Sequence, residues 1–66
     1  MKDIVCTIYK KDYETSRIYY EIERVFNKQG DYEFVLYSIK DSNRTKIAKK
    51  DSPLELEKLI NWTSQV

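Results

Sequence analysis

A hairpin built around the single glycine restricts the fold of this 66-residue chain more than any other segment. Apolar and charged side chains alternate from Arg17 to Phe26, as in a strand with one buried face. Asn27-Lys28-Gln29-Gly30 follows as a turn, with Gly30 where a residue of positive φ is needed after a type I turn. A bulge at Gly30 sets Phe26 opposite Tyr32 and joins the apolar sides of both strands.

Three further segments have the composition of strands. Ile4 to Tyr9 is rich in β-branched and aromatic residues, which favours a short strand. Tyr32 to Lys40 is apolar on both faces and is therefore expected inside the sheet. After a turn at Asp41-Ser42-Asn43, the segment from Arg44 to Lys49 reads as an edge strand, with Ile47 as its main apolar anchor.

The stretch from Asp51 to Val66 has the pattern of a capped, amphipathic helix. Ser52 precedes Pro53, and Glu55 stands at the third helical position, so both side chains can satisfy free N–H groups of the first turn. Leu54 falls on the outer side and Trp62 at the edge of the apolar stripe. The residues expected to face the core are Leu56, Leu59, Ile60, Thr63 and Val66.

These elements predict an α+β fold in a single small domain spanning residues 1–66. It consists of an antiparallel meander sheet of three to four strands, followed by one C-terminal helix packed on one face, in the order β-β-β-β-α. The side bearing Ile4, Ile8, Ile22 and Leu36 is the natural one for the helix to cover.

The residue inventory argues against catalysis. The chain has no histidine, one cysteine and one glycine, so it lacks a phosphate-cradling loop, metal-ligand spacing and a cysteine–histidine pair. We therefore expect no enzymatic activity, no cofactor and no metal. No apolar run reaches the roughly 20 residues that cross a bilayer, no signal peptide is evident, and Cys6 stands alone. These features predict a cytoplasmic protein with no membrane partner.

One helix can cover only one side of the sheet, so the other side is expected to remain exposed. That side mixes tyrosines, aliphatic residues and carboxylates, and an exposed apolar patch on a small protein usually marks a contact surface. The alternative, that long polar side chains merely shield an ordinary sheet surface, stays open. The candidate protein-binding residues are Tyr9, Tyr19, Glu21, Glu23, Val35, Tyr37 and Ile39, with Trp62 from the helix.

The sequence thus predicts a small non-enzymatic protein-binding module that acts as an accessory or inhibitory protein. Its composition, rich in Lys, Ile and Tyr, is typical of accessory proteins of the phage or mobile-element type. The partner is another protein or a second copy of the chain, because a homodimer would close the tyrosine-rich face without an outside partner.

The alternative function is binding of single-stranded nucleic acid, with sheet tyrosines stacking on bases and a basic edge holding phosphates. Against it stand the net charge of only +1 and three carboxylates, Glu21, Glu23 and Glu33, on the same face. The basic residues of this alternative are Lys40, Arg44, Lys46, Lys49 and Lys50.

Overall fold

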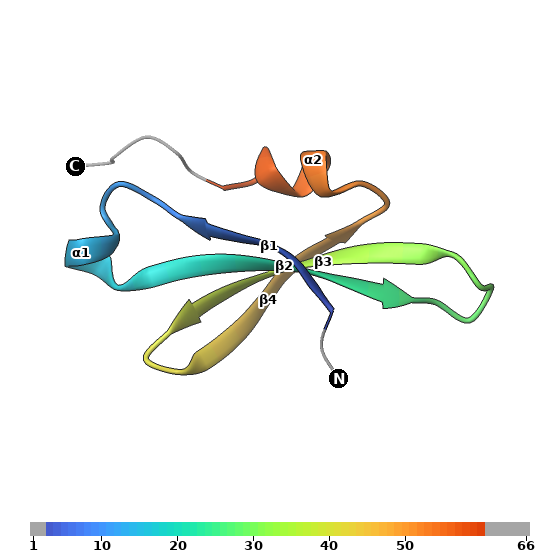
Figure 1. Cartoon of the computed structure of the whole chain (residues 1–66), viewed down its shortest axis with the longest axis horizontal. Coiled ribbons are helices and arrows are strands. Elements are labelled where there is room, and N and C mark those ends of the chain that lie inside the picture. The colour runs from blue at the N-terminus through green and yellow to red at the C-terminus, as the bar shows by residue number, and fades with distance from the viewer. Residues whose placement is uncertain (1–2, 61–66) are drawn as a thin grey trace.

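A computed structural model describes residues 3–60 of the chain, which form one antiparallel sheet with a short helix on one face (Figure 1). The strands follow one another in the sheet in chain order, each paired to the next, so the predicted β-β-β-β-α arrangement is confirmed. The elements are β1 (Ile4–Tyr9), α1 (Tyr13–Ser16), β2 (Ile18–Phe26), β3 (Tyr32–Lys40), β4 (Asn43–Lys50) and α2 (Pro53–Glu57).

The register of the β2–β3 hairpin is the predicted one. Phe26 pairs with Tyr32, and the pairing continues without interruption to Ile18 and Lys40. Gly30 has a φ of 85°, which places it in the region that favours glycine. The Asn27 side chain closes the turn, because its Oδ1 accepts hydrogen bonds from the backbone N–H groups of Gln29 at 2.9 Å and Asp31 at 3.0 Å.

The β3–β4 hairpin turns over two residues, Asp41 and Ser42, between the paired Lys40 and Asn43. Both turn residues have positive φ, 53° for Asp41 and 69° for Ser42. Tight hairpins favour such turns because their twist matches the right-handed twist of the strands. Serine has no special tolerance for this region, so its backbone is strained here.

Bulges in the two edge strands change the direction of two apolar residues. The bulge in β1 sets Ile4 opposite Glu23 and Cys6 opposite Ile22, so Ile4 belongs to the face away from α2 and not, as predicted, to the helix side. The bulge in β4 leaves Ile47 unpaired and exposed, whereas Ala48 pairs with Leu36. The prediction of Ile47 as the apolar anchor of β4 was therefore wrong; Ala48 packs against the core instead.

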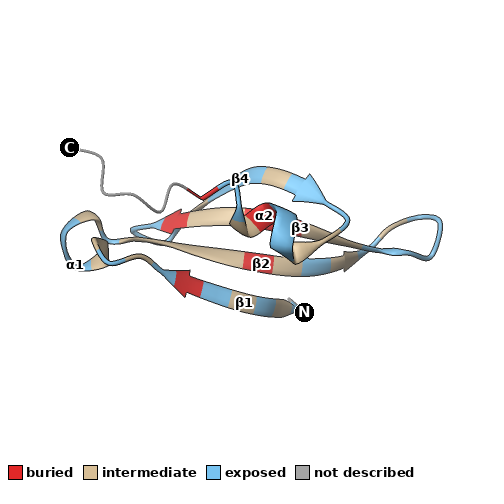
Figure 2. Cartoon of the chain, turned by 90° about the horizontal axis from the view of Figure 1, so that it is seen from above, coloured by how far each residue is buried: buried red, intermediate tan, exposed pale blue. Residues whose placement is uncertain are grey.

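The core lies between the middle of the sheet and α2 (Figure 2). Helix α2 has only five residues, so it covers only a small part of the sheet. The apolar side chains that folding removes from water are gathered under that part. The buried cluster consists of Ile8, Ile22 and Leu36 from the sheet with Leu56 and Ile60 from the C-terminal segment.

Helix α2 begins where the sequence predicts and is shorter than predicted. The Ser52 hydroxyl accepts a hydrogen bond from the Leu54 N–H at 3.3 Å, while Glu55 makes no reciprocal bond within residues 3–60. The helix ends at Glu57, and the N–H groups of Leu59 and Ile60 each bond a carbonyl three residues back, which is a tighter winding. Leu59 is consequently turned outward and is 49% exposed, against the prediction. Thr63, Val66 and the candidate Trp62 lie outside the described residues.

Candidate protein-binding face

The sheet face turned away from α2, here called the tyrosine-rich face, gathers most of the predicted site residues. Cross-strand pairs in an antiparallel sheet lie side by side on one face, so the register arranges these residues in rows across all four strands. The rows are Tyr9, Tyr19, Ile39 and Arg44; then Thr7, Glu21, Tyr37 and Lys46; then Ile4, Glu23, Val35 and Lys49.

Two predicted contact residues on this face are buried. Val35 is 4% exposed and Ile39 is 6% exposed, although neither belongs to the core cluster beneath α2. Glu23 and Lys49 flank Val35 in the register, and longer neighbours can lay their carbon stems over such a small residue. The expectation that both residues are exposed was therefore wrong.

Arg44, on the edge strand β4, joins several side chains of the face. Its guanidinium carbon lies 3.6 Å from the centre of the Tyr37 ring, which is a close cation–π contact. Its Nη2 donates to Glu23 Oε1 at 3.2 Å, and its Nε lies 3.6 Å from Glu21 Oε1. The Nε atom is buried and has no hydrogen-bond partner in the described part of the chain. The Tyr37 ring and the two carboxylates hold the Arg44 side chain in this position.

The carboxylates of the face are all matched by basic side chains of β4. Besides the two pairs of Arg44, Lys49 Nζ lies 3.4 Å from Glu33 Oε1. Asn27 Nδ2 donates to the other oxygen of Glu33 at 3.3 Å. The three carboxylates that argue against nucleic acid in the sequence are thus paired, and so are two of the basic groups that would have to bind phosphate.

A cluster of three tyrosine rings covers one end of the face. Tyr9 and Tyr19 pair across β1 and β2, and their rings stack with centroids 5.1 Å apart. Tyr13, from α1, meets Tyr9 edge-on at 4.9 Å and Tyr19 at 6.2 Å. Tyr9 is 57% exposed, so the stack presents its outer side to solvent.

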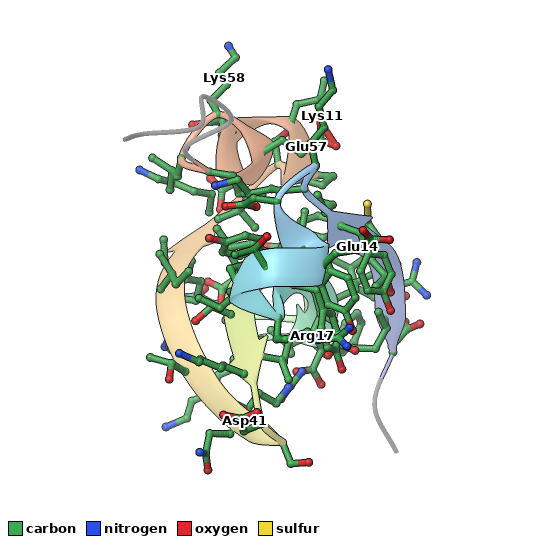
Figure 3. The ribbon with its side chains drawn as sticks, turned by 90° about the vertical axis from the view of Figure 1, so that its left-hand side faces the viewer. Lys11, Glu14, Arg17, Asp41, Glu57 and Lys58 are labelled. Carbon is green, nitrogen blue, oxygen red and sulfur yellow. The ribbon has the colours of Figure 1, made fainter. Side chains whose placement is uncertain are left out.

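Helix α1, which carries Tyr13, was not predicted. The helix is a single turn of four residues, which is too short to show a helical repeat of apolar positions. It ends at Arg17, whose φ of 60° reverses the chain into β2 (Figure 3). Asp12 stands before this turn as an N-cap residue without a side-chain cap, and a preceding aspartate is a weak sequence signal.

The environment of Tyr19 raises its pKa above the ordinary value. Burial is the main cause, since it disfavours the charged phenolate. The negative charges of the Glu21 carboxylate and of the ionised Tyr9 and Tyr13 side chains raise the pKa further, while Arg44 lowers it. The neutral hydroxyl is therefore the form that the folded face favours.

The predicted basic edge does not form one patch. By register, Arg44, Lys46 and Lys49 belong to the tyrosine-rich face, whereas Lys40 and Lys50 pair with residues that share the α2 side. Lys40, Lys46 and Lys50 are exposed, while Arg44 and Lys49 are engaged with carboxylates. The five residues therefore do not line a common groove for a phosphate backbone.

A second aromatic group, expected from the sequence as a cross-strand pair but not as a contact surface, lies near the tip of the β2–β3 hairpin. Phe26 and Tyr32 are both exposed, with ring centroids 4.7 Å apart, on the side of the sheet that α2 partly covers. Arg24 lies 4.7 Å over the Tyr32 ring and is ion-paired with Asp3 at 2.6 Å. Figure 1 shows this hairpin tip away from α2, in agreement with the exposure of both rings.

Two further findings concern the described residues. Within residues 3–60, no three side chains of His, Cys, Asp or Glu come together in a way that could hold a metal ion. The helices of that same range are too short and too polar for one to cross a membrane.

No protein-family model matches the chain, and neither a curated protein nor a solved structure matches it.

Proposed function

We propose that this protein is a small non-enzymatic binding module that uses its tyrosine-rich face to contact another protein. The observation that carries the proposal is the network in which Arg44 lies over Tyr37 and joins Glu21 and Glu23. It supports a preformed surface of aromatic and arginine side chains. Such side chains dominate the binding energy of protein interfaces.

Rigidity favours this use of the face. Binding loses free energy when side chains must become ordered, and less is lost when they already hold one arrangement. The stacked Tyr9 and Tyr19 rings and the arginine held between a ring and two carboxylates are such preordered groups. The exposed side of Tyr9 offers an apolar ring and a hydroxyl to a partner.

The charge balance of the face indicates the chemistry of the partner. Its carboxylates and basic groups largely neutralise each other, so a complementary surface would recognise the rings and hydrogen-bonding groups more than a net charge. A protein surface fits this description better than a phosphate backbone does. A module of this kind acts by occupying a surface, as an accessory or inhibitory protein does.

A second copy packed face to face is a weaker candidate for the occupant. Such a dimer would gain free energy by burying exposed aliphatic side chains of the face. Val35 and Ile39, however, are already buried within the single chain. The partner proposed for this face is therefore a different protein.

The test compares two tyrosines of similar exposure on opposite faces. Tyr9→Ser alters the tyrosine-rich face, and Tyr32→Ser is the matched control near the hairpin tip. Immobilised wild-type protein is used to retrieve a partner from cells that express it; the partner is identified, purified and titrated by calorimetry. We expect Tyr9→Ser to weaken binding by about tenfold or more and Tyr32→Ser to leave it unchanged. Circular dichroism verifies that both variants fold.

Salt dependence separates the two functional classes. We expect the affinity for the purified partner to change little between about 50 and 200 mM salt, and a mixed-sequence single-stranded oligonucleotide not to bind. Oligonucleotide binding that falls steeply over this range would contradict the proposal. So would a purified partner whose affinity is lowered by Tyr32→Ser and not by Tyr9→Ser.

A further inference from the structure

We propose that the outer edge of β1 pairs with β1 of a second copy of the chain, joining two four-stranded sheets into one. Strands β1 and β4 form the two edges of the sheet and lie on opposite flanks of the molecule (Figure 3). Within residues 3–60, no segment pairs with the outer side of β1. Such an edge presents unpaired N–H and C=O groups that can bind another strand.

The two edges differ in how well they are protected against such pairing. Both edge strands contain a bulge, but only β4 carries charge, with four basic side chains, and charges keep an edge strand from pairing. Strand β1 has the sequence IVCTIY, with no charge, proline or glycine. Two of its side chains are large, apolar and exposed, Val5 at 43% and Tyr9 at 57%. The unprotected edge is therefore β1.

Only one of the three possible edge pairings ends after two copies and avoids placing like charges opposite each other. Pairing of β4 with a second β4 would set lysines and arginines against each other, which destabilises cross-strand pairs. Pairing of β1 with β4 would leave one free edge on each side and would continue into an open chain of molecules. Pairing of β1 with β1 about a two-fold axis closes after two copies and brings no like charges together.

The alternation of side chains restricts the register of this pairing. Residues opposite each other in an antiparallel pair share one face, so a symmetric pair must be centred on a residue and not between two. With Thr7 at the centre, Thr7 lies opposite Thr7 of the second copy, and Cys6 lies opposite Ile8. Val5, the bulged residue of β1, then lies beside Tyr9 of the second copy, and both exposed apolar side chains of β1 gain a neighbour. We infer this register.

The arrangement has a structural consequence. The two-fold axis is perpendicular to the sheet, so both α2 helices lie on one side and both tyrosine-rich faces on the other. The dimer thereby presents one continuous surface twice as wide. The inference does not depend on the proposed function, because it concerns the backbone edge and not what the face contacts.

The experiment uses light scattering after size exclusion, over loaded concentrations from about 1 μM to about 1 mM. We expect the wild-type mass to rise from the 8.0 kDa of one chain to twice that value and no further. Thr7→Lys and Thr7→Glu each place like charges opposite one another across the two-fold axis. We expect each to raise the dimer dissociation constant about fivefold or more.

Mixing the two charge variants provides the specific readout. An equal mixture of Thr7→Lys and Thr7→Glu sets opposite charges against each other, and we expect it to restore the dimer mass. Thr45→Lys is the matched control, because Thr45 is an exposed threonine on the other edge strand, and it leaves the dimer intact. A wild-type chain that stays monomeric at every concentration overturns the proposal. So does a dimer that Thr7→Lys leaves unchanged, or a mixture that stays monomeric.

Hydrogen exchange tests the same pairing without any variant, should a charged variant fail to fold. In a monomer, the β1 amides that point away from β2 exchange freely; in the dimer they donate to the second copy. We expect their protection to increase with protein concentration, while the amides of β4 do not change. Equal protection of the β1 amides at all concentrations contradicts the proposal.

Discussion

The guanidinium carbon of Arg44 on β4 lies 3.6 Å from the centre of the Tyr37 ring on β3. The contact is diagonal, because Tyr37 pairs directly with Lys46, and Arg44 pairs with Ile39. From this position the arginine also reaches Glu21 and Glu23 on the next strand. One side chain thus connects three strands on the face that α2 does not cover.

Removal of Arg44 is expected to destabilise the fold. Arg44→Ala loses the contact with Tyr37 and leaves Glu21 and Glu23 close together without their cation, and we expect a loss of about 1–3 kcal/mol in unfolding free energy. Arg44→Lys restores only part of it, because an ammonium group cannot stack flat on the ring and reach both carboxylates. Lys46→Ala, an exposed neighbour, is the control and changes stability by less than about 0.5 kcal/mol. Urea unfolding measures all three, and equal midpoints for Arg44→Ala and Lys46→Ala would refute the structural role.

Ser42→Gly is expected to stabilise the protein. Ser42 has a φ of 69°, which glycine adopts without steric conflict. The gain is about 1 kcal/mol, reduced by the greater freedom of glycine in the unfolded chain. Thermal unfolding followed by circular dichroism gives the result. A lower midpoint would mean that the serine side chain contributes more than its backbone strain.

Two leucines of the C-terminal segment are expected to behave differently, although the helical repeat alone puts both on the core face. Leu56 is fully buried and Leu59 is 49% exposed. Leu56→Ala should cost about 2–5 kcal/mol, which is enough to unfold a domain of this size. Leu59→Ala should change stability by less than about 0.5 kcal/mol. Similar losses in the two variants would show that the helix continues past Glu57.

Stability is expected to fall in alkaline solution because of Tyr19. The folded state raises the pKa of its hydroxyl above the ordinary 10.0, so the folded chain holds this proton more tightly than the unfolded chain. The contribution is complete below pH 10 and is lost as the pH rises through the folded pKa. Tyr19→Phe should flatten this decline, and Tyr32→Phe should not. Unfolding curves between about pH 8 and 11 test it, and a steeper decline in Tyr19→Phe would contradict the assignment.

The sequence was sufficient to predict the β2–β3 hairpin because two independent signals agree there. The alternation of side chains and the position of Gly30 select the same register, and a slip by one residue would break both. The bulges of β1 and β4 could not be predicted, because each adds one residue inside a short strand and changes the alternation for only a few positions. The reversed positions of Ile4 and Ile47 follow from this.

The composition of the candidate face was predictable, but its internal contacts were not. Alternation places Tyr19, Glu21 and Tyr37 on one side of the sheet, and the register confirms it. The position of Arg44 over Tyr37 depends on the β3–β4 register and on a side-chain orientation that no periodicity encodes. For the same reason the sequence could not show that Val35 and Ile39 are buried, because alternation alone places them on the face that α2 does not cover.

Photo-cross-linking in the cells that express the chain shows whether the tyrosine-rich face contacts another protein. A benzophenone amino acid replaces Tyr9 in one variant and Tyr32, on the opposite side, in the other. We expect position 9 to give a covalent adduct with a protein other than a second copy of the chain, and position 32 to give none. Adducts from position 32 alone, or adducts from position 9 that contain only nucleic acid, would contradict it.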